Sequence, residues 1–237
     1  MNEHISSAYD RELEAITALI MKMGGHVEDA IMKAVQSLVD RDLELAEAVR
    51  AGDKIIDALE RQINEEAARV IALRAPVSKD LRSLLTVLRI AASLERVGDY
   101  AKNIAKRNSA LAEMTMVSGA DAALRRMARE VQAMLKDTLD AYIRSDADLA
   151  AQVRLRDEDV DHMYNALFRE FLTFMMEDPR NITACMHLHF MAKNIERMGD
   201  LTTNIAEQVI YQVTGEIPEE PRPKDDNTAF LSDPKAD

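Results

Sequence analysis

Apolar residues recur every three or four positions along most of the chain, the spacing that places them on one face of an α-helix. In residues 5–39 this stripe contains Ile16, Leu19, Ile20, Met23, Val27, Ile31, Val35 and Leu38. A second stripe covers residues 43–73, and Asp42 is placed to cap its start. A third begins at Pro76, which suits the first turn of a helix, and continues to about residue 109.

The same pattern restarts after a break near Val117–Gly119. It predicts three more helices closed by Gly215, over residues 120–144, 147–177 and 180–213. The connections are short, so successive helices should be antiparallel. We therefore predict an all-α protein of two tandem antiparallel three-helix bundles and a disordered tail that is acidic and rich in proline. The ranges are 5–112 for the first bundle, 118–214 for the second and 215–237 for the tail.

The composition agrees with a helical protein and narrows its function. Hydrophobic residues make up 47% of the chain, and glycine and proline are scarce. The net charge of −12 argues against a nucleic-acid binder, which needs a basic surface. The single cysteine, Cys185, excludes an internal disulfide framework. Neither a signal peptide nor a membrane-spanning run is evident, so we expect a cytoplasmic protein that reaches a membrane only through partners.

One segment occurs twice and carries the candidate chemistry. The sequence LERVGDYAKNIA starts at Leu94, and IERMGDLTTNIA starts 101 residues later (195 − 94) at Ile195. In both copies a glutamate precedes an aspartate by four residues, just over one helical turn, so the two carboxylates face the same way. The pairs are Glu95 with Asp99 and Glu196 with Asp200.

A second repeated motif, D-x-x-x-D, lies one helix earlier in each half. It consists of Asp53 and Asp57 in the first half and of Asp157 and Asp161 in the second. In a three-helix bundle the two motif-bearing helices lie side by side. Four carboxylates in each half can therefore converge on one edge.

Carboxylates this close on one face repel each other, and a cation relieves the repulsion. Lys102 can pair with Asp99 in the first half, whereas no Lys or Arg follows the second pair of acids at three or four residues. Two interpretations stay open here. One is ordinary ion pairing, including cross-helix pairs with Arg96 or Arg197, and the other is a hard-cation site. Oxygen ligands alone suit Mg, Ca, Mn or iron rather than structural zinc.

The glycines and histidines add less. Gly98 and Gly199, inside the two copies, favour close approach of a neighbouring helix over a ligand, because a helical glycine costs about 0.5–1 kcal/mol relative to alanine. The Gly24–Gly25 pair either kinks the first helix or allows close packing. Cys185 and His189 share a face with the second glutamate, but His189 lies about 10 Å from it along the axis, so we assign both to packing.

An enzyme is the main alternative class. The sequence contains no nucleophile–base pair, P-loop or dinucleotide fingerprint. A ferritin-like di-iron oxidase would show Glu-x-x-His on two helices, and none of the five histidines has a glutamate three residues before it. We expect no catalysis, with a carboxylate-bridged metalloenzyme or a metal-dependent phosphate binder as the alternative.

Taken together, these motifs resemble the PhoU family. They are the doubled E-R-[VM]-G-D-x-x-x-N-I-A, the two D-x-x-x-D helices, M-x-M-G-G at 21–25 and T-F-M-M-E-D-P-R at 173–180. The resemblance covers about residues 4–214. It implies a negative regulator of the phosphate-starvation (Pho) response that modulates phosphate uptake. Such a protein links the Pst phosphate ABC transporter, through its ATPase subunit PstB, to the PhoR sensor histidine kinase, and we expect a homodimer.

The resemblance also implies a site, because some PhoU proteins bind multinuclear iron or other metals through E/D-x-x-x-D motifs. Carried onto this chain, the motifs place ligands for iron, Mg or Mn at Asp53, Asp57, Glu95, Asp99, Asp157, Asp161, Glu196 and Asp200. Asn103 and Asn204 lie one turn beyond the motif aspartates and are expected to support them.

Overall fold

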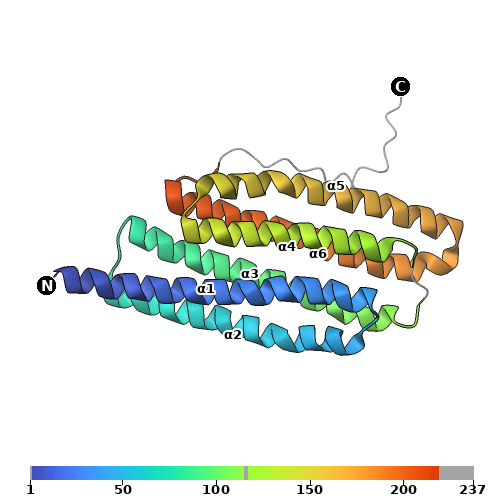
Figure 1. Ribbon diagram of the computed structural model, residues 1–237, viewed down its shortest axis with the longest axis horizontal. Coiled ribbons are helices and arrows are strands. Elements are labelled where there is room, and N and C mark those ends of the chain that lie inside the picture. Colours follow the sequence, from blue (N-terminus) through green and yellow to red (C-terminus); the bar gives the residue numbers. More distant parts are fainter. Residues whose placement is uncertain (1, 115–116, 219–237) are drawn as a thin grey trace, which may run out of the picture.

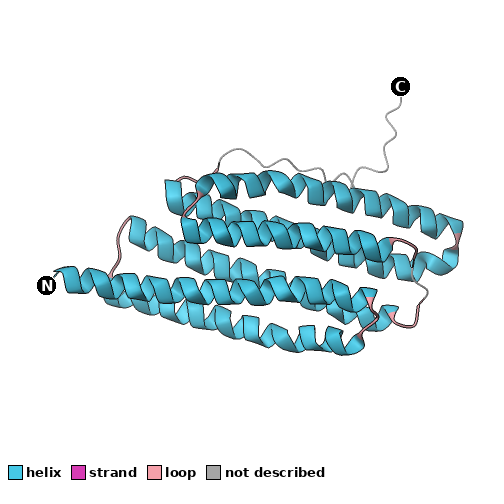
Figure 2. Cartoon of the chain, in the orientation of Figure 1, coloured by secondary structure: helices cyan, strands magenta, loops and turns pink. Residues whose placement is uncertain are grey.

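The computed structural model describes residues 2–114 and 117–218. In chain order these form α1 Asn2–Val39, α2 Leu43–Arg74, α3 Lys79–Leu111, α4 Ala120–Arg144, α5 Ala147–Glu177, a 3₁₀ turn at Pro179–Asn181, and α6 Ile182–Thr214. Within those ranges the regular elements are all helical (Figure 2). The predicted all-α fold is confirmed. The tail predicted from residue 215 lies mostly outside the described residues, which end at Pro218.

Local polar groups fix the helix ends that the sequence indicated. Asp42 accepts a hydrogen bond from the backbone N–H of Leu45 at 2.9 Å, and Asp146 accepts one from Leu149 at 2.9 Å. Each satisfies one of the N–H groups that a helix N-terminus leaves without a partner. Gly215 ends α6 with φ of 88°, a left-handed conformation that glycine adopts without strain.

Three predicted helix starts were wrong by two or three residues. α1 begins at Asn2 rather than at residue 5. α3 begins at Lys79 rather than at Pro76, because Ser78 (φ 49°, ψ −114°) is not helical and separates Pro76 from the helix. In the second half, Pro179 opens a 3₁₀ turn, and Asp178 accepts a hydrogen bond from the backbone N–H of Arg180 at 2.9 Å. α6 therefore starts at Ile182.

The two halves lie side by side and share one core. α1–α3 form one antiparallel bundle and α4–α6 the other, with α3 packed along α6 and α1 along α4 (Figure 1). The buried apolar residues form a single cluster that runs through both halves. Fully buried members from both sides of the seam include Ile20, Ile90, Leu135 and Ile195. The bundles are thus two repeats of one packed unit.

The glycine pair in α1 serves this packing. α1 continues as a helix through both glycines. A Cβ at Gly24 would overlap the Leu139 side chain of α4, whereas a Cβ at Gly25 would meet open space. Close packing at the seam, and not a kink, accounts for Gly24.

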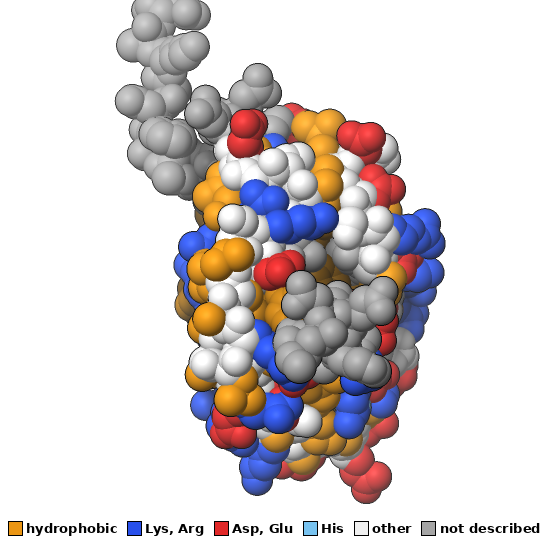
Figure 3. All heavy atoms as spheres, turned by 90° about the vertical axis from the view of Figure 1, so that its left-hand side faces the viewer, with side chains coloured by type: hydrophobic (Ala, Val, Ile, Leu, Met, Phe, Trp, Pro, Cys, Tyr) orange, Lys and Arg blue, Asp and Glu red, His pale blue; other side chains and the backbone are white. Residues whose placement is uncertain are grey.

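The end of the molecule where α1 begins exposes several hydrophobic side chains among charged ones (Figure 3). The last turn of α2 contributes Leu73 and the α2–α3 connection contributes Val77, which are 67% and 72% exposed. Among the described residues, no helix combines the length and apolar character needed to cross a membrane.

The role of Gly24 gives a first prediction. Gly24→Leu should lower the free energy of unfolding by about 1–3 kcal/mol, because it overpacks the contact with Leu139. Gly25→Leu, the matched control on the exposed side, should raise it by about 0.5–1 kcal/mol through better helix propensity. Urea unfolding of both variants measures the difference, and equal effects would contradict close packing at Gly24.

Candidate functional site

The first predicted carboxylate cluster forms between α2 and α3. Lys102 Nζ lies 2.5 Å from Asp53 Oδ2 and 3.1 Å from Asp99 Oδ1, so one ammonium group joins the two motif-bearing helices. Asp53 is 5% exposed, whereas Asp57 and Glu95 are partly buried. The sequence anticipated the pairing of Lys102 with Asp99 but not its closer contact with Asp53.

Burial makes ionisation of two members of this cluster, Asp53 and Glu95, less favourable. Burial raises the pKa of Asp53, against the lowering effect of Lys102. It also raises the pKa of Glu95, with further contributions from Asp99 and Glu60. Glu60 was not predicted as a member of this cluster. Its position three residues after Asp57 on the same helix is the spacing that could have identified it.

The second cluster, between α5 and α6, is more deeply buried. Asp157, Asp161 and Glu196 are 1%, 2% and 4% exposed, and Asp200 is partly buried. Burial raises the pKa of Glu196, and the charges of Asp200 and Asp161 raise it further. Lys193 Nζ donates to Glu196 Oε1 at 2.9 Å, which partly offsets these effects.

In each half one lysine pairs with the cluster, but the two lysines lie on opposite sides of the E-x-x-x-D motif in the sequence. Lys102 follows the first motif, and its counterpart 101 residues later is Thr203. Lys193 precedes the second motif, and its counterpart 101 residues earlier is Ala92. The inference that the second half lacks a local cation was wrong, because Lys193 lies three residues before Glu196 rather than after it. That spacing also allows pairing on a helix.

The motif glycines let the helices come close, as predicted. A Cβ at Gly98 would lie 2.9 Å from Ile56 Cδ1 of α2. A Cβ at Gly199 would lie 2.8 Å from Asp157 Oδ1 of α5. In the second half a carboxylate thus packs directly against the glycine, which explains why Asp157 is so deeply buried.

The carboxylate oxygens of both clusters suit a hard cation, but in this structure they are paired with lysine ammonium groups. Asp53 Oδ1 and Glu196 Oε2 are buried and accept no hydrogen bond from the described part of the chain. Unsatisfied carboxylate oxygens of this kind attract a cation. However, no three His, Cys, Asp or Glu side chains in residues 2–114 and 117–218 are arranged to hold a metal ion. The metal site therefore stays a prediction, and binding would require the lysines to move.

The remaining candidates have other roles. Asn103 and Asn204 are exposed, and Asn103 lines a groove between α3 and α6. Cys185 is buried, and the His189 ring lies 5.8 Å from that of Tyr164 and 5.2 Å from that of Phe168. This agrees with the assignment of Cys185 and His189 to packing.

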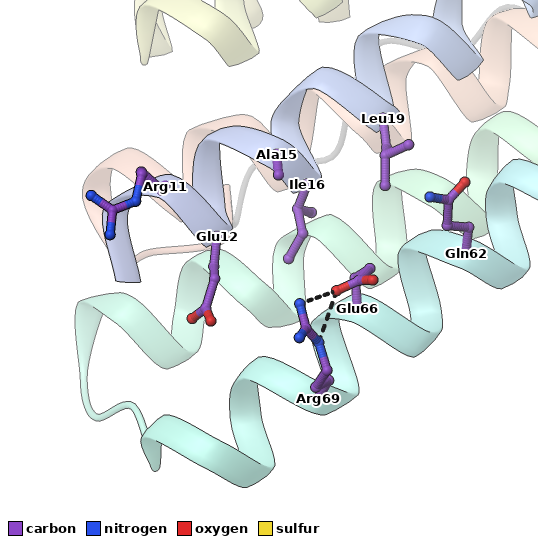
Figure 4. Close-up of a pocket in the computed structure, with 8 residues that line it drawn as sticks. All are labelled: Arg11, Glu12, Ala15, Ile16, Leu19, Gln62, Glu66 and Arg69. Atoms are coloured by element: carbon purple, nitrogen blue, oxygen red, sulfur yellow. Dashed lines mark hydrogen bonds and ion pairs between the residues drawn. The ribbon is translucent and has the colours of Figure 1, made fainter. Parts of the chain in front are cut away.

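A separate pocket of about 440 Å³ lies between α1 and α2 (Figure 4). Three of its four charged side chains, Glu12, Glu66 and Arg69, already have partners. Arg69 pairs with Glu66 at 2.6 Å, and Glu12 pairs with Arg74 at 3.0 Å. The eight predicted metal ligands are absent from its wall, which consists of Arg11, Glu12, Ala15, Ile16, Leu19, Gln62, Glu66 and Arg69.

Known proteins of one family match the chain over most of its length. The family model described as PhoU domain matches residues 20–107 and 124–209. A protein of Rhizobium meliloti, named phosphate-specific transport system accessory protein PhoU homolog, is 49% identical over 96% of this chain and 96% of its own.

Two solved structures have the same fold. PhoU from Pseudomonas aeruginosa has a TM-score of 0.84 at 39% identity, covering 88% of this chain and all (100%) of its own. The phosphate transport system regulatory protein PhoU from Streptococcus pneumoniae has a TM-score of 0.83 at 29% identity, covering 90% and 100%. The tandem arrangement of the two bundles is thus that of these structures.

The raised pKa of Glu196 predicts a pH-dependent stability. Because the folded-state pKa lies above the ordinary 4.5, stability from the protonated group is present below pH 4.5 and is lost as the pH rises through the folded value. Glu196→Gln cannot ionise and should therefore gain stability relative to the parent protein as the pH rises.

The measurement is urea unfolding of both proteins at several values from about pH 5 to about pH 8. Glu65→Gln, on the exposed side of α2, removes the same charge outside the cluster and is the control. A Glu196→Gln difference that stays flat with pH, or that falls, would show that burial does not raise this pKa.

Proposed function

The chain belongs to the PhoU family, and on that basis we propose that it is a negative regulator of the phosphate-starvation response. The observation that carries the proposal is the extent of the family match, which includes both three-helix repeats. Named relatives align over nearly their full lengths, and their names place them as accessories to phosphate-specific transport. The similarity thus extends over both repeats and over nearly the full length of these relatives, rather than over one domain.

The proposed mode of action is that of an adaptor. The protein joins the ATPase subunit PstB of the Pst phosphate transporter to a PhoR-type histidine kinase, as a cytoplasmic homodimer that works through contacts rather than catalysis. Two features support this mode. The shared core joins the six helices into one packed unit, and the two carboxylate clusters place related chemistry at two positions in it. Related but unequal faces suit a protein with two different partners.

A metal at the clusters is the second part of the proposal. We propose that a divalent or iron ion takes the place of the lysine ammonium, since a doubly charged ion interacts more strongly with several carboxylates than one ammonium does. The first cluster is the stronger candidate. Glu60 adds an acid there, whereas the corresponding residue 104 positions later is Tyr164, and the Lys193 ammonium lies 4.8 Å from that ring centre.

This exchange can be tested by removing the lysine. Lys102→Met should raise the affinity for Mn²⁺ by about tenfold or more, because the carboxylates lose their internal cation. Lys54→Met changes the net charge equally at an exposed position of α2 and should leave the affinity unchanged.

Isothermal titration calorimetry with Mn²⁺ measures both affinities, and circular dichroism checks that helicity is kept. If Mn²⁺ binds neither variant, or binds Lys102→Met and Lys54→Met with equal affinity, the clusters are ion-paired structural elements. The metalloenzyme alternative would fail with the same result, because it needs the metal.

The regulatory role has a genetic test. Deleting the gene should leave phosphate-starvation genes expressed in phosphate-rich medium, and pull-down of the protein from phosphate-replete cells should recover PstB and the kinase. A reporter fused to a starvation-induced promoter measures the first effect. Repression that persists in the deletion strain would count against the regulatory role, whatever the metal result.

A further inference from the structure

A basic groove lies at the seam between the two repeats, apart from both carboxylate clusters. It has a volume of about 450 Å³ and is formed by the C-terminal half of α3 and the N-terminal half of α6. Its wall consists of Asn103, Lys106, Arg107, Ala110, His187 and Asn194. This wall has three basic side chains, two amides and no carboxylate, although the whole chain has a net charge of −12.

The cations of the groove have no acidic partner in the described part of the chain. Neither Lys106 nor Arg107 forms an ion pair or a side-chain hydrogen bond with another described residue. The Arg107 guanidinium instead stacks on Phe190 of α6, 4.4 Å from the ring centre. Such stacking fixes the plane of the guanidinium and leaves its N–H groups available at the edge to donate to an oxyanion.

His187 adds a third basic group, and one of its ring nitrogens has no hydrogen-bond partner among the described residues. That atom, Nδ1, is buried. A buried N–H without a partner is less tolerable than a buried bare acceptor. The neutral ring therefore favours the proton on Nε2, where it can be donated.

The second repeat shows that the helical scaffold does not require this chemistry. At the other end of the seam, 101 residues away in each repeat, Lys106 corresponds to Glu207 and Arg107 to Gln208. There Glu207 and Gln208 both have internal partners. Arg154 pairs with Glu207 at 3.1 Å, and Arg89 donates to Gln208 at 3.1 Å.

The position of His187 also differs, since its counterpart is Thr86, which is fully buried. At that end the counterparts of the two groove cations are thus an ion-paired acid and a hydrogen-bonded amide. The other end presents cations and amide groups without an internal acid.

We propose that the α3–α6 groove binds a phosphate-class oxyanion, either inorganic phosphate or a small phosphomonoester. A lysine and an arginine together match a dianion, and the arginine fork fits two oxygens of a tetrahedral anion. The amides of Asn103 and Asn194 supply further donors. The groove volume exceeds that of a single phosphate ion, so it accommodates the substituent of an ester. Binding here requires no metal and does not depend on the proposed regulatory role.

Isothermal titration calorimetry with inorganic phosphate and, separately, with glycerol 3-phosphate tests the proposal on the full chain. EDTA in the buffer removes any route through a metal at the carboxylate clusters. We expect saturable binding of at least one anion, weakened at least about tenfold by the pair Lys106→Ala and Arg107→Ala. The pair Arg126→Ala and Arg129→Ala, on the exposed face of α4, removes the same charge and should leave the affinity unchanged.

A further variant separates the groove from general charge. Phe190→Leu keeps every cation but removes the ring that supports Arg107, and it should weaken binding several-fold. Absence of binding by both anions up to about 10 mM would overturn the proposal. So would an equal loss in the groove pair and the control pair, which would show that the anion responds to net charge alone.

Discussion

A carboxylate buried on an otherwise apolar helix face must either meet a positive charge or take up a proton, and this requirement organises both halves of the protein. Asp53 and Glu196 are almost completely buried, and each has one oxygen paired with a lysine and one that accepts no hydrogen bond from the described residues. Raised pKa values at both residues show that the lysines only partly offset the burial. The lysines therefore leave part of the negative charge of the clusters unneutralised, and this is the physical basis for proposing that a metal ion binds there.

The rest of the fold serves to hold these clusters at fixed positions. One continuous apolar core joins the repeats, and glycines at close crossings allow α3 to approach α2, and α6 to approach α5. The repeats keep the same carboxylates but have diverged at several polar positions around them. The cluster lysines lie on opposite sides of the motif, one cluster is more deeply buried, and Lys106 and Arg107 of the groove are replaced by Glu207 and Gln208 in the second repeat. A duplicated scaffold thus offers two chemically distinct regions, which is compatible with the proposed adaptor mode.

Much of the fold could be predicted from sequence because helical periodicity and capping residues are local properties. The helix starts near Pro76 and Pro179 were misplaced because backbone conformation at Ala75 and Ser78, and the 3₁₀ turn, leave no periodic signal. The eight carboxylates were identified by spacing, but their burial depends on tertiary contacts such as Asp157 against Gly199.

Two features of the polar surface were missed for related reasons. Lys193 could have been found by considering the residues before Glu196 as well as those after it. The basic groove could not, because it depends on which ends of α3 and α6 meet across the two repeats.

If the carboxylate clusters carry the proposed regulatory role, and are not only part of the packing, changing their charge should change signalling. The most direct test is a strain that carries Glu95→Gln together with Glu196→Gln, with a reporter of starvation-gene expression measured in phosphate-rich medium. The amides keep the shape of the side chains, and burial already favours the neutral form of both, so the protein should fold and accumulate normally. The account predicts that starvation genes are expressed in this strain despite normal protein levels. Full repression with the folded double variant would contradict it.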